Sequence, residues 1–259
     1  MKYFVVYISC IQTALHSALA YRLNFILSLL ITLGSNLLFP LVTVLIYNMG
    51  ASFPGWSFGE VLLLQSIFAL SNGLSGVLFS GVLWATMQHV REGSFEVVLL
   101  KPSSPLFFLI VTNFDVSNLG LLAGGLGLFV ISLNLVVIPS ILAVLSFIIL
   151  FPAGFAVMAG VNLMMAATSF KWVGNSRIPE IFESFTNFGK YPLSIFPNVI
   201  RGLVSFVVPV GVIAYYPASA LLGDIEPSVL LLILPCILFL CFGIITYRHM
   251  VKLYEGVGG

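Results

Sequence analysis

The chain contains repeated apolar runs that are long enough to cross a lipid bilayer as helices. A membrane-spanning helix needs about 20 consecutive apolar residues, and 60% of the 259 residues are hydrophobic while only 7% are charged. An ordinary soluble domain has about 45–50% apolar residues. Together with a mean hydropathy of +1.14, these values predict an all-α polytopic membrane protein with a single domain over residues 1–259.

Six of these apolar runs are predicted to be transmembrane helices. The fifth is short and contains Pro209, so we expect a short re-entrant helix from Ala218 to Leu222 to continue it on the outer side of the membrane without crossing. The predicted spans are Leu23–Tyr47, Val61–Ala85, Val116–Val137, Ile141–Ala167, Gly202–Tyr216 and Leu230–Tyr247.

Residues 1–22 show an amphipathic pattern ahead of the first span. Tyr7, Ile11 and Leu15 recur at helical spacing on one side, whereas Gln12 and His16 fall on the other. This pattern is typical of a helix that lies in the membrane interface. An additional span is the alternative, but no turn separates this run from the next one.

The distribution of basic residues predicts the orientation. With six spans, all basic residues fall on one side, and the opposite loops, around residues 48–59, 138–140 and 217–228, contain none. Because Lys and Arg concentrate on the cytoplasmic side, both termini are predicted to be cytoplasmic in a multi-pass cell-membrane protein. The basic residues are Lys2, Arg22, Arg91, Lys101, Lys171, Arg177, Lys190, Arg201, Arg248 and Lys252.

Several polar residues occur inside the predicted spans. Asn36, Asn72, Ser75 and Asn162 would lie in hydrocarbon, where amide and hydroxyl groups need hydrogen-bond partners. Two interpretations stay open, namely helix packing and the lining of a translocation path. Two interpretations also stay open for Asp115, which could be a hydrated residue at the membrane interface or a residue that faces the substrate.

The sequence offers no residues for catalysis or for a bound cofactor. Cys10, Cys236 and Cys241 lie in apolar surroundings and do not form a metal-ligand pattern. There is no phosphate-binding loop GxxxxGK[ST] and no paired carboxylates within a span. A net charge of +1 also leaves no basic face for nucleic acid. We therefore expect neither a catalytic site, a metal site nor a nucleic-acid partner.

Residues 86–104, between the second and third spans, concentrate charge in this apolar chain. The stretch Met87–Pro102 reads MQHVREGSFEVVLLKP and is predicted to be a short cytoplasmic helix. Its charged residues would face water or a partner, and its apolar residues the membrane or a partner's groove. A plain solvated connector is the alternative. The charged residues are Arg91, Glu92 and Glu96, and the apolar residues are Phe95, Val98 and Leu99.

This stretch resembles a loop pattern, R-x-G-x-[LF]-[DE]-x-x-L-x-x-P, found in the membrane subunits of type-2 ABC exporters. A second similar region runs from Phe188 to Gly223, and Tyr21-Arg22 also fits. The branch that the chain resembles is described as "ABC-2 family transporter protein". The residues that match the loop pattern are Arg91, Gly93, Phe95, Glu96, Leu99 and Pro102.

The resemblance implies a permease subunit of an ATP-driven exporter that works by alternating access. Such a subunit pairs with a second permease, identical or related, within membrane lipids, while separate ABC ATPase subunits bind ATP and Mg²⁺. An amphipathic, lipid-like or drug-like substrate is expected, since the spans are apolar. A non-catalytic scaffold or assembly protein and a lipid-modifying membrane enzyme are the alternatives. The implied ATPase-coupling residues are Arg91, Glu92, Gly93, Phe95 and Glu96.

Overall fold

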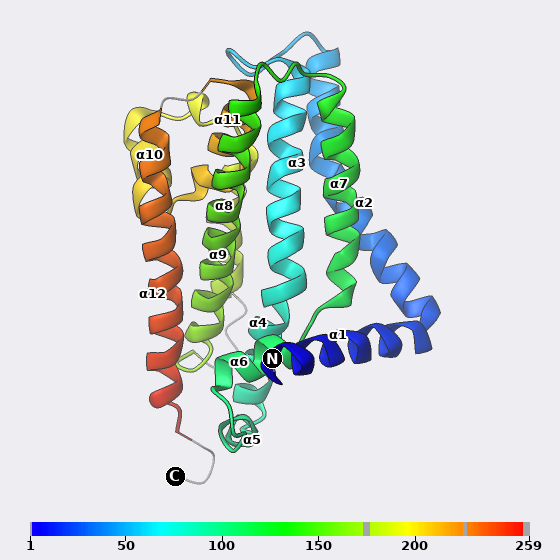
Figure 1. Ribbon diagram of the computed structural model, residues 1–259, viewed down its shortest axis with the longest axis vertical. Coiled ribbons are helices and arrows are strands. Elements are labelled where there is room, and N and C mark those ends of the chain that lie inside the picture. The colour runs from blue at the N-terminus through cyan, green and yellow to red at the C-terminus, as the bar shows by residue number, and fades with distance from the viewer. Residues whose placement is uncertain (1, 173–176, 225–226, 256–259) are drawn as a thin grey trace.

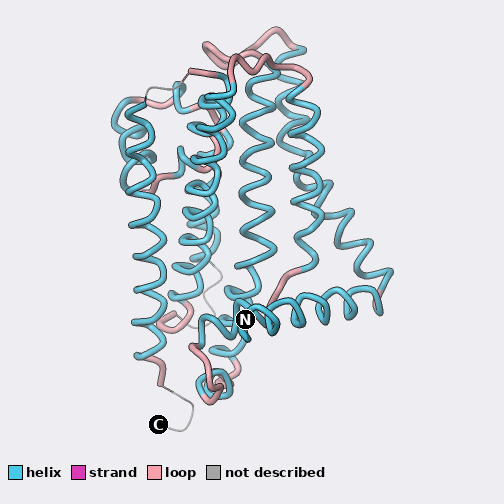
Figure 2. The backbone as a smooth tube through the Cα atoms, viewed as in Figure 1, coloured by secondary structure: helices cyan, strands magenta, loops and turns pink. Residues whose placement is uncertain are grey.

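The computed structural model describes residues 2–172, 177–224 and 227–255, and these residues form helices and loops with no strand among them (Figure 2). Long helices stand side by side, in the order α12, α8, α3, α7 and α2 across the view of Figure 1. The all-helical prediction is confirmed. The bounds of these helices are α2 Arg22–Asn48, α3 Phe58–Ser75, α7 Leu119–Leu133, α8 Ile141–Thr168 and α12 Ile233–Lys252.

The two ends of this bundle differ. One end, called here the terminal end, holds α1 (Lys2–Ala20), residues 86–104 and the C-terminal end of α12 (Figure 1). The opposite end, called the far end, holds the loop at residues 49–57, which leads into α3. At that loop Ser57 and Glu60 form a reciprocal capping box, which satisfies the first amides of α3 and fixes where the helix begins.

Helix α3 is the central helix of the bundle. It continues through a π-helical turn, η1 (Gly76–Ser80), into α4 (Gly81–Arg91), so that the helical run extends over 34 residues. Within its most apolar window 78% of the residues are buried, more than in any other long helix described. Its burial follows from contact with α7 on one side and α8 on the other.

Small residues permit the close approach of these helices. A Cβ atom at Gly73 would lie 2.7 Å from the backbone nitrogen of Leu122 in α7, and one at Gly125 would lie 2.9 Å from that of Leu70 in α3. Helices α8 and α12 approach in the same manner, since a Cβ at Gly243 would lie 2.9 Å from the carbonyl oxygen of Gly160. Without side chains at these positions, backbone packs on backbone, as is common between membrane helices.

Helix α1 lies across the terminal end instead of standing with the bundle (Figure 1). It contacts the beginning of α2 and also α6 (Pro105–Thr112). This crosswise placement suits the amphipathic pattern predicted for residues 1–22. Its location in a membrane interface stays a prediction.

Five helical runs in the described residues are long and apolar enough to cross a membrane, and the predicted count of six spans is not confirmed. These runs correspond to five of the predicted spans, with ends shifted by a few residues. They are Arg22–Asn48, Phe58–Arg91, Val116–Leu133, Ile141–Thr168 and Val229–Lys252.

The predicted fifth span at Gly202–Tyr216 is not confirmed, because no continuous helix covers these residues. A short helix begins in α10 (Asn198–Gly202), and its last turn, η5, ends at Val207. Pro209 has no amide hydrogen and disfavours helical geometry at the residue before it, so the helix stops there. Ten residues rise only about 15 Å, half of a bilayer core. A further short helix, α11 (Tyr215–Leu222), follows and includes the predicted helix at 218–222.

The chain instead returns to the far end through α9 (Arg177–Asn187), η3 (Phe188–Lys190) and η4 (Leu193–Ile195), beside α8 (Figure 1). The sequence analysis predicted all basic residues on one side. Two of them, however, do not lie at the terminal end with the others. Lys190 lies within the bundle, and Arg201, in α10, donates hydrogen bonds to backbone carbonyls of residues 193–196 in the far half.

The glycine contacts allow a matched test of α3–α7 packing. Replacing Gly125 with Leu places a side chain where α3 backbone lies, so we expect a loss of about 1–3 kcal/mol in stability. Gly127→Leu is the control, because a Cβ at that position of the same helix meets nothing within 4 Å. Thermal unfolding in detergent should show a lower Tm for the first variant only. Equal Tm values would contradict the packing argument.

Candidate functional site

The 86–104 segment begins where α4 ends in a tight turn. Gly93 has a φ of +67°, a left-handed conformation that residues with a Cβ rarely adopt. The amide of Ser94 then donates to the carbonyl oxygen of His89 at 2.8 Å, and the two side chains of these residues are also hydrogen bonded, with Nδ1 2.8 Å from Oγ. This turn reverses the chain and leads into the single-turn helix α5 (Glu96–Leu99).

Phe95 anchors the segment to the rest of the chain. Its side chain is fully buried, and its ring meets those of Phe170, after α8, and Tyr254, after α12, at centroid distances of 4.8 and 5.4 Å. Edge contacts of this kind stabilise aromatic clusters. Val98 is also buried. The prediction that these two side chains face the membrane or a partner's groove is therefore wrong, because both pack inside the chain.

Five other residues of the segment form an exposed surface of mixed character. Arg91, Glu92 and Glu96 are exposed, as their charges predict. Beside them Leu100 has 84% of its surface exposed and Val97 52%. Exposed apolar residues next to charges are typical of a protein–protein contact surface. We call these five residues the segment surface.

A cleft of about 710 Å³ adjoins this surface. Its walls come from α4, from the end of α8 and from the beginning of α9, and include Trp84, Trp172 and Pro179. Arg91 and Glu92 line its edge, and Glu92 accepts a hydrogen bond from the side chain of Gln88 at 3.0 Å. The segment surface is thus continuous with a concave area at the terminal end.

A second cleft, of about 370 Å³, lies between α2, α3 and α9 and is called here the central cleft. Asn36 of α2 and Asn72 of α3, both predicted to line a path, are among its walls. Gln65 and Asn72 are the eighth and fifteenth residues of the α3–η1–α4 run, roughly 10 and 21 Å from its start. The cleft therefore lies along the half of this helical run that is nearer the far end.

The central cleft carries polar groups that are not fully paired. Gln65 donates to Thr43 Oγ1 at 2.7 Å, but its own Oε1 is buried without a hydrogen-bond partner among the described residues. Lys190 enters from η3, and its Nζ lies 5.6 Å from the ring centre of Phe39 and 5.4 Å from that of Phe68. The two faces stabilise the ammonium group where water is scarce.

The other two candidate path residues have a different role. Asn162 of α8 donates from Nδ2 to Ser75 Oγ of α3 at 3.1 Å and to the carbonyl oxygen of Met158 at 3.0 Å. Neither residue lines the central cleft. This pair connects α3 with α8, so helix packing accounts for both residues.

Asp115 belongs to a hydrogen-bonded turn. Its Oδ2 accepts from Ser80 Oγ at 2.9 Å and from Asn118 Nδ2 at 2.8 Å, while Oδ1 accepts from the amide of Ser117 at 3.0 Å. The carboxylate therefore fixes the turn before α7 against the π-helical turn η1. These hydrogen bonds give the carboxylate a structural role.

Sequence reasoning missed most residues of the central cleft, among them Gln65, Glu183 and Lys190. Glu183 and Lys190 lie in the stretch FESFTNFGK, which alternates phenylalanines with polar residues and was assigned to a cytoplasmic loop. A pattern of that kind, between two apolar runs, could have indicated a short amphipathic helix inside the bundle.

The fold and its apolar helices define a multi-pass membrane protein. A family model described as "ABC-2 family transporter protein" matches residues 30–258, nearly the whole chain. The chain therefore belongs to the ABC-2 family of transporters, as its loop pattern suggested, and is a membrane component of a transporter. No curated protein and no solved structure gave a match.

The burial of Phe95 predicts how the segment responds to truncation. Phe95→Ala removes a buried aromatic side chain, which typically costs about 3–5 kcal/mol, and we expect local opening of residues 92–104. Hydrogen–deuterium exchange should show faster exchange there, with α3 unchanged. Leu100→Ala is the control, since that side chain is 84% exposed. If both variants exchanged like the unmodified chain, the anchoring role of Phe95 would be refuted.

Proposed function

We propose that this chain is the permease subunit of an ATP-driven exporter whose ATP and Mg²⁺ are bound by separate ATPase subunits. The family match over residues 30–258 is the observation that carries this proposal. The segment surface supports it, because a folded, exposed patch at one end of the bundle suits docking to another protein.

The terminal end is proposed to face the cytoplasm in the cell membrane. Arg22, Arg91, Lys101, Lys171 and Lys252 lie near helix ends there, which agrees with the usual excess of basic residues on that side. Helix α1 would then rest in the inner membrane interface. The short helices α10 and α11 would form re-entrant structure on the outer side.

Pairing with a second permease, identical or related, would complete the path. Helix α9 borders the central cleft and exposes Ile181 and Phe185, at 56% and 51% of their surfaces. Exposed apolar side chains beside polar ones suit a contact with another protein better than a contact with lipid. The central cleft of each subunit would then open towards a path between the two.

Coupling would run along one continuous helix. The segment surface follows directly on α4, which continues through η1 into α3 and reaches Asn72 in the central cleft. Closure of the ATPase pair would displace the segment and tilt this helix, exposing the cleft alternately to the two sides. An amphipathic substrate fits a cleft that combines aromatic and polar walls.

Charge reversal on the segment surface tests the coupling. We expect Arg91→Glu and Glu96→Lys to lower transport and transport-linked ATP hydrolysis by roughly ten-fold or more, equivalent to about 1.4 kcal/mol of coupling, while membrane insertion is unchanged. The measurement is ATPase activity of the complex that co-purifies with the tagged chain, reconstituted in vesicles.

Arg248→Glu is the matched control, because Arg248 is also exposed near the terminal end but belongs to α12. The proposal fails if no phosphate-loop ATPase co-purifies with the chain. It also fails if both segment variants keep full transport and ATP hydrolysis.

Cysteine labelling tests the orientation. In a variant without its three cysteines, Asp224→Cys at the far end should react with a membrane-impermeant maleimide in intact cells. Glu92→Cys at the terminal end should react only after permeabilisation, because both residues are exposed but lie at opposite ends. Labelling of Glu92→Cys in intact cells would reverse the proposed orientation.

A further inference from the structure

Two opposite charges share the central cleft. Glu183 of α9 and Lys190 of η3 both line it, and the carboxylate of Glu183 acts electrostatically on Lys190. Among the described residues, however, no ion pair within 4.0 Å joins them. The two charges therefore share the cleft without a direct contact that would neutralise them.

The surrounding groups add further unused hydrogen-bonding capacity. The buried Oε1 of Gln65 has no partner among the residues that the structure describes, and a buried oxygen without one costs about 1–3 kcal/mol. Within the part of the chain that the structure describes, the side-chain amides of Asn72 and Asn187 also make no hydrogen bond. The cleft thus offers donors and acceptors together that have no hydrogen-bond partner in the described chain.

The geometry points to the central cleft as a binding site for a zwitterionic group. Its anionic part, a phosphate or carboxylate, would approach the ammonium of Lys190, and its cationic part the carboxylate of Glu183. The amide groups of Asn72 and Gln65 would donate to and accept from the same ligand. The inference that this ligand is the transported substrate rests on the proposed export function. The inference that the cleft binds such a ligand does not.

A zwitterion fits better than a single ion. An anion alone would leave Glu183 beside it without compensation, and a cation alone would do the same to Lys190. Phe39 and Phe68 hold the Lys190 ammonium by their ring faces and leave its remaining N–H groups free to donate. The group could belong to a lipid headgroup or to a free zwitterionic solute.

Equilibrium binding of radiolabelled lysophosphatidylcholine to the purified full chain in maltoside micelles tests the site. Unlabelled lysophosphatidylglycerol and monoacylglycerol of equal chain length serve as anionic and uncharged competitors. We expect saturable binding of lysophosphatidylcholine, and neither of the two competitors should displace it efficiently. Glycerophosphocholine, which has no acyl chain, distinguishes the sources: full competition supports a free solute, and weak competition supports a lipid headgroup.

Both charges are required in this scheme. Lys190→Gln and Glu183→Gln should each weaken binding by roughly ten-fold, the effect of about 1.4 kcal/mol. Asn72→Ala, which breaks no hydrogen bond in the described chain, should weaken it by a smaller factor without altering folding. Thermal unfolding and size-exclusion profiles of every variant show whether it is folded.

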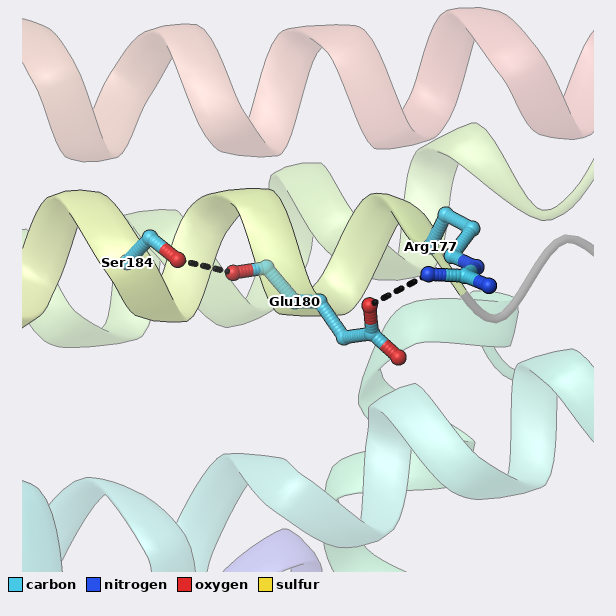
Figure 3. Close-up of polar contacts among 3 residues, drawn as sticks. All are labelled: Arg177, Glu180 and Ser184. Atoms are coloured by element: carbon cyan, nitrogen blue, oxygen red, sulfur yellow. Dashed lines mark hydrogen bonds and ion pairs between the residues drawn. The ribbon is translucent and has the colours of Figure 1, made fainter.

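Two matched controls lie outside the cleft. Glu180 belongs to the same helix as Glu183 but forms an ion pair with Arg177, with Nη1 3.6 Å from Oε2, and its carbonyl oxygen accepts from Ser184 Oγ at 2.8 Å (Figure 3). Glu180→Gln should therefore leave binding unchanged. Lys171→Gln, after the end of α8, is the equivalent control for Lys190.

Three results would overturn the inference. Absence of saturable binding excludes the site. Preference for lysophosphatidylglycerol with no effect of Glu183→Gln indicates a simple anion site. If the Glu183 and Lys190 variants destabilise a dimer of the chain but still bind lysophosphatidylcholine, a second copy of the chain covers the cleft instead. The binding assay contains no ATPase, so its result is independent of the coupling test. Failure of this inference can therefore be distinguished from failure of the proposed function.

Discussion

The rest of the fold depends on the close packing of α3 between α7 and α8. Gly73 and Gly125 let α3 and α7 touch at the backbone, and the Asn162–Ser75 hydrogen bond connects α3 to α8. In a bilayer no hydrophobic force drives helices together, so association depends on such close contacts and on polar pairs. α3 therefore occupies the centre, and the residues on its surface meet other helices instead of lipid.

This central position separates the polar residues of α3 into two groups. Ser71 and Ser75 have partners on neighbouring elements, the carbonyl oxygen of Ile213 and the amide of Asn162, and stabilise the bundle. Gln65 and Asn72 line the central cleft and keep polar groups that have no partner in the described part of the chain. Polar residues that look alike in the sequence thus differ in role according to the side of one helix on which they lie.

The apolar runs allowed most long helices to be predicted from the sequence, because twenty-residue hydrophobic segments have few alternatives to a membrane helix. The family was recognisable from the loop pattern around Gly93. Two features were not predicted. Phe95 is buried by rings of Phe170 and Tyr254, which are distant in sequence. The return begins with α9, a short amphipathic helix that shows in the sequence pattern of residues 182–190 but not in a hydropathy window.

The π-helical turn η1 interrupts the regular α-helical geometry of the central helix between the central cleft and the segment surface. It lies after Asn72 and before α4, and the hydrogen bonds of Asp115 with Ser80 and Asn118 fix it against the turn that precedes α7. π-helical turns frequently occur at functional positions. A displacement of the 86–104 segment would be carried along α4 to this point, and because η1 is bound to the α7 turn, α3 and α7 would move together. The central cleft, bounded by α2, α3, α7 and α9, would then change shape through its α3 and α7 walls.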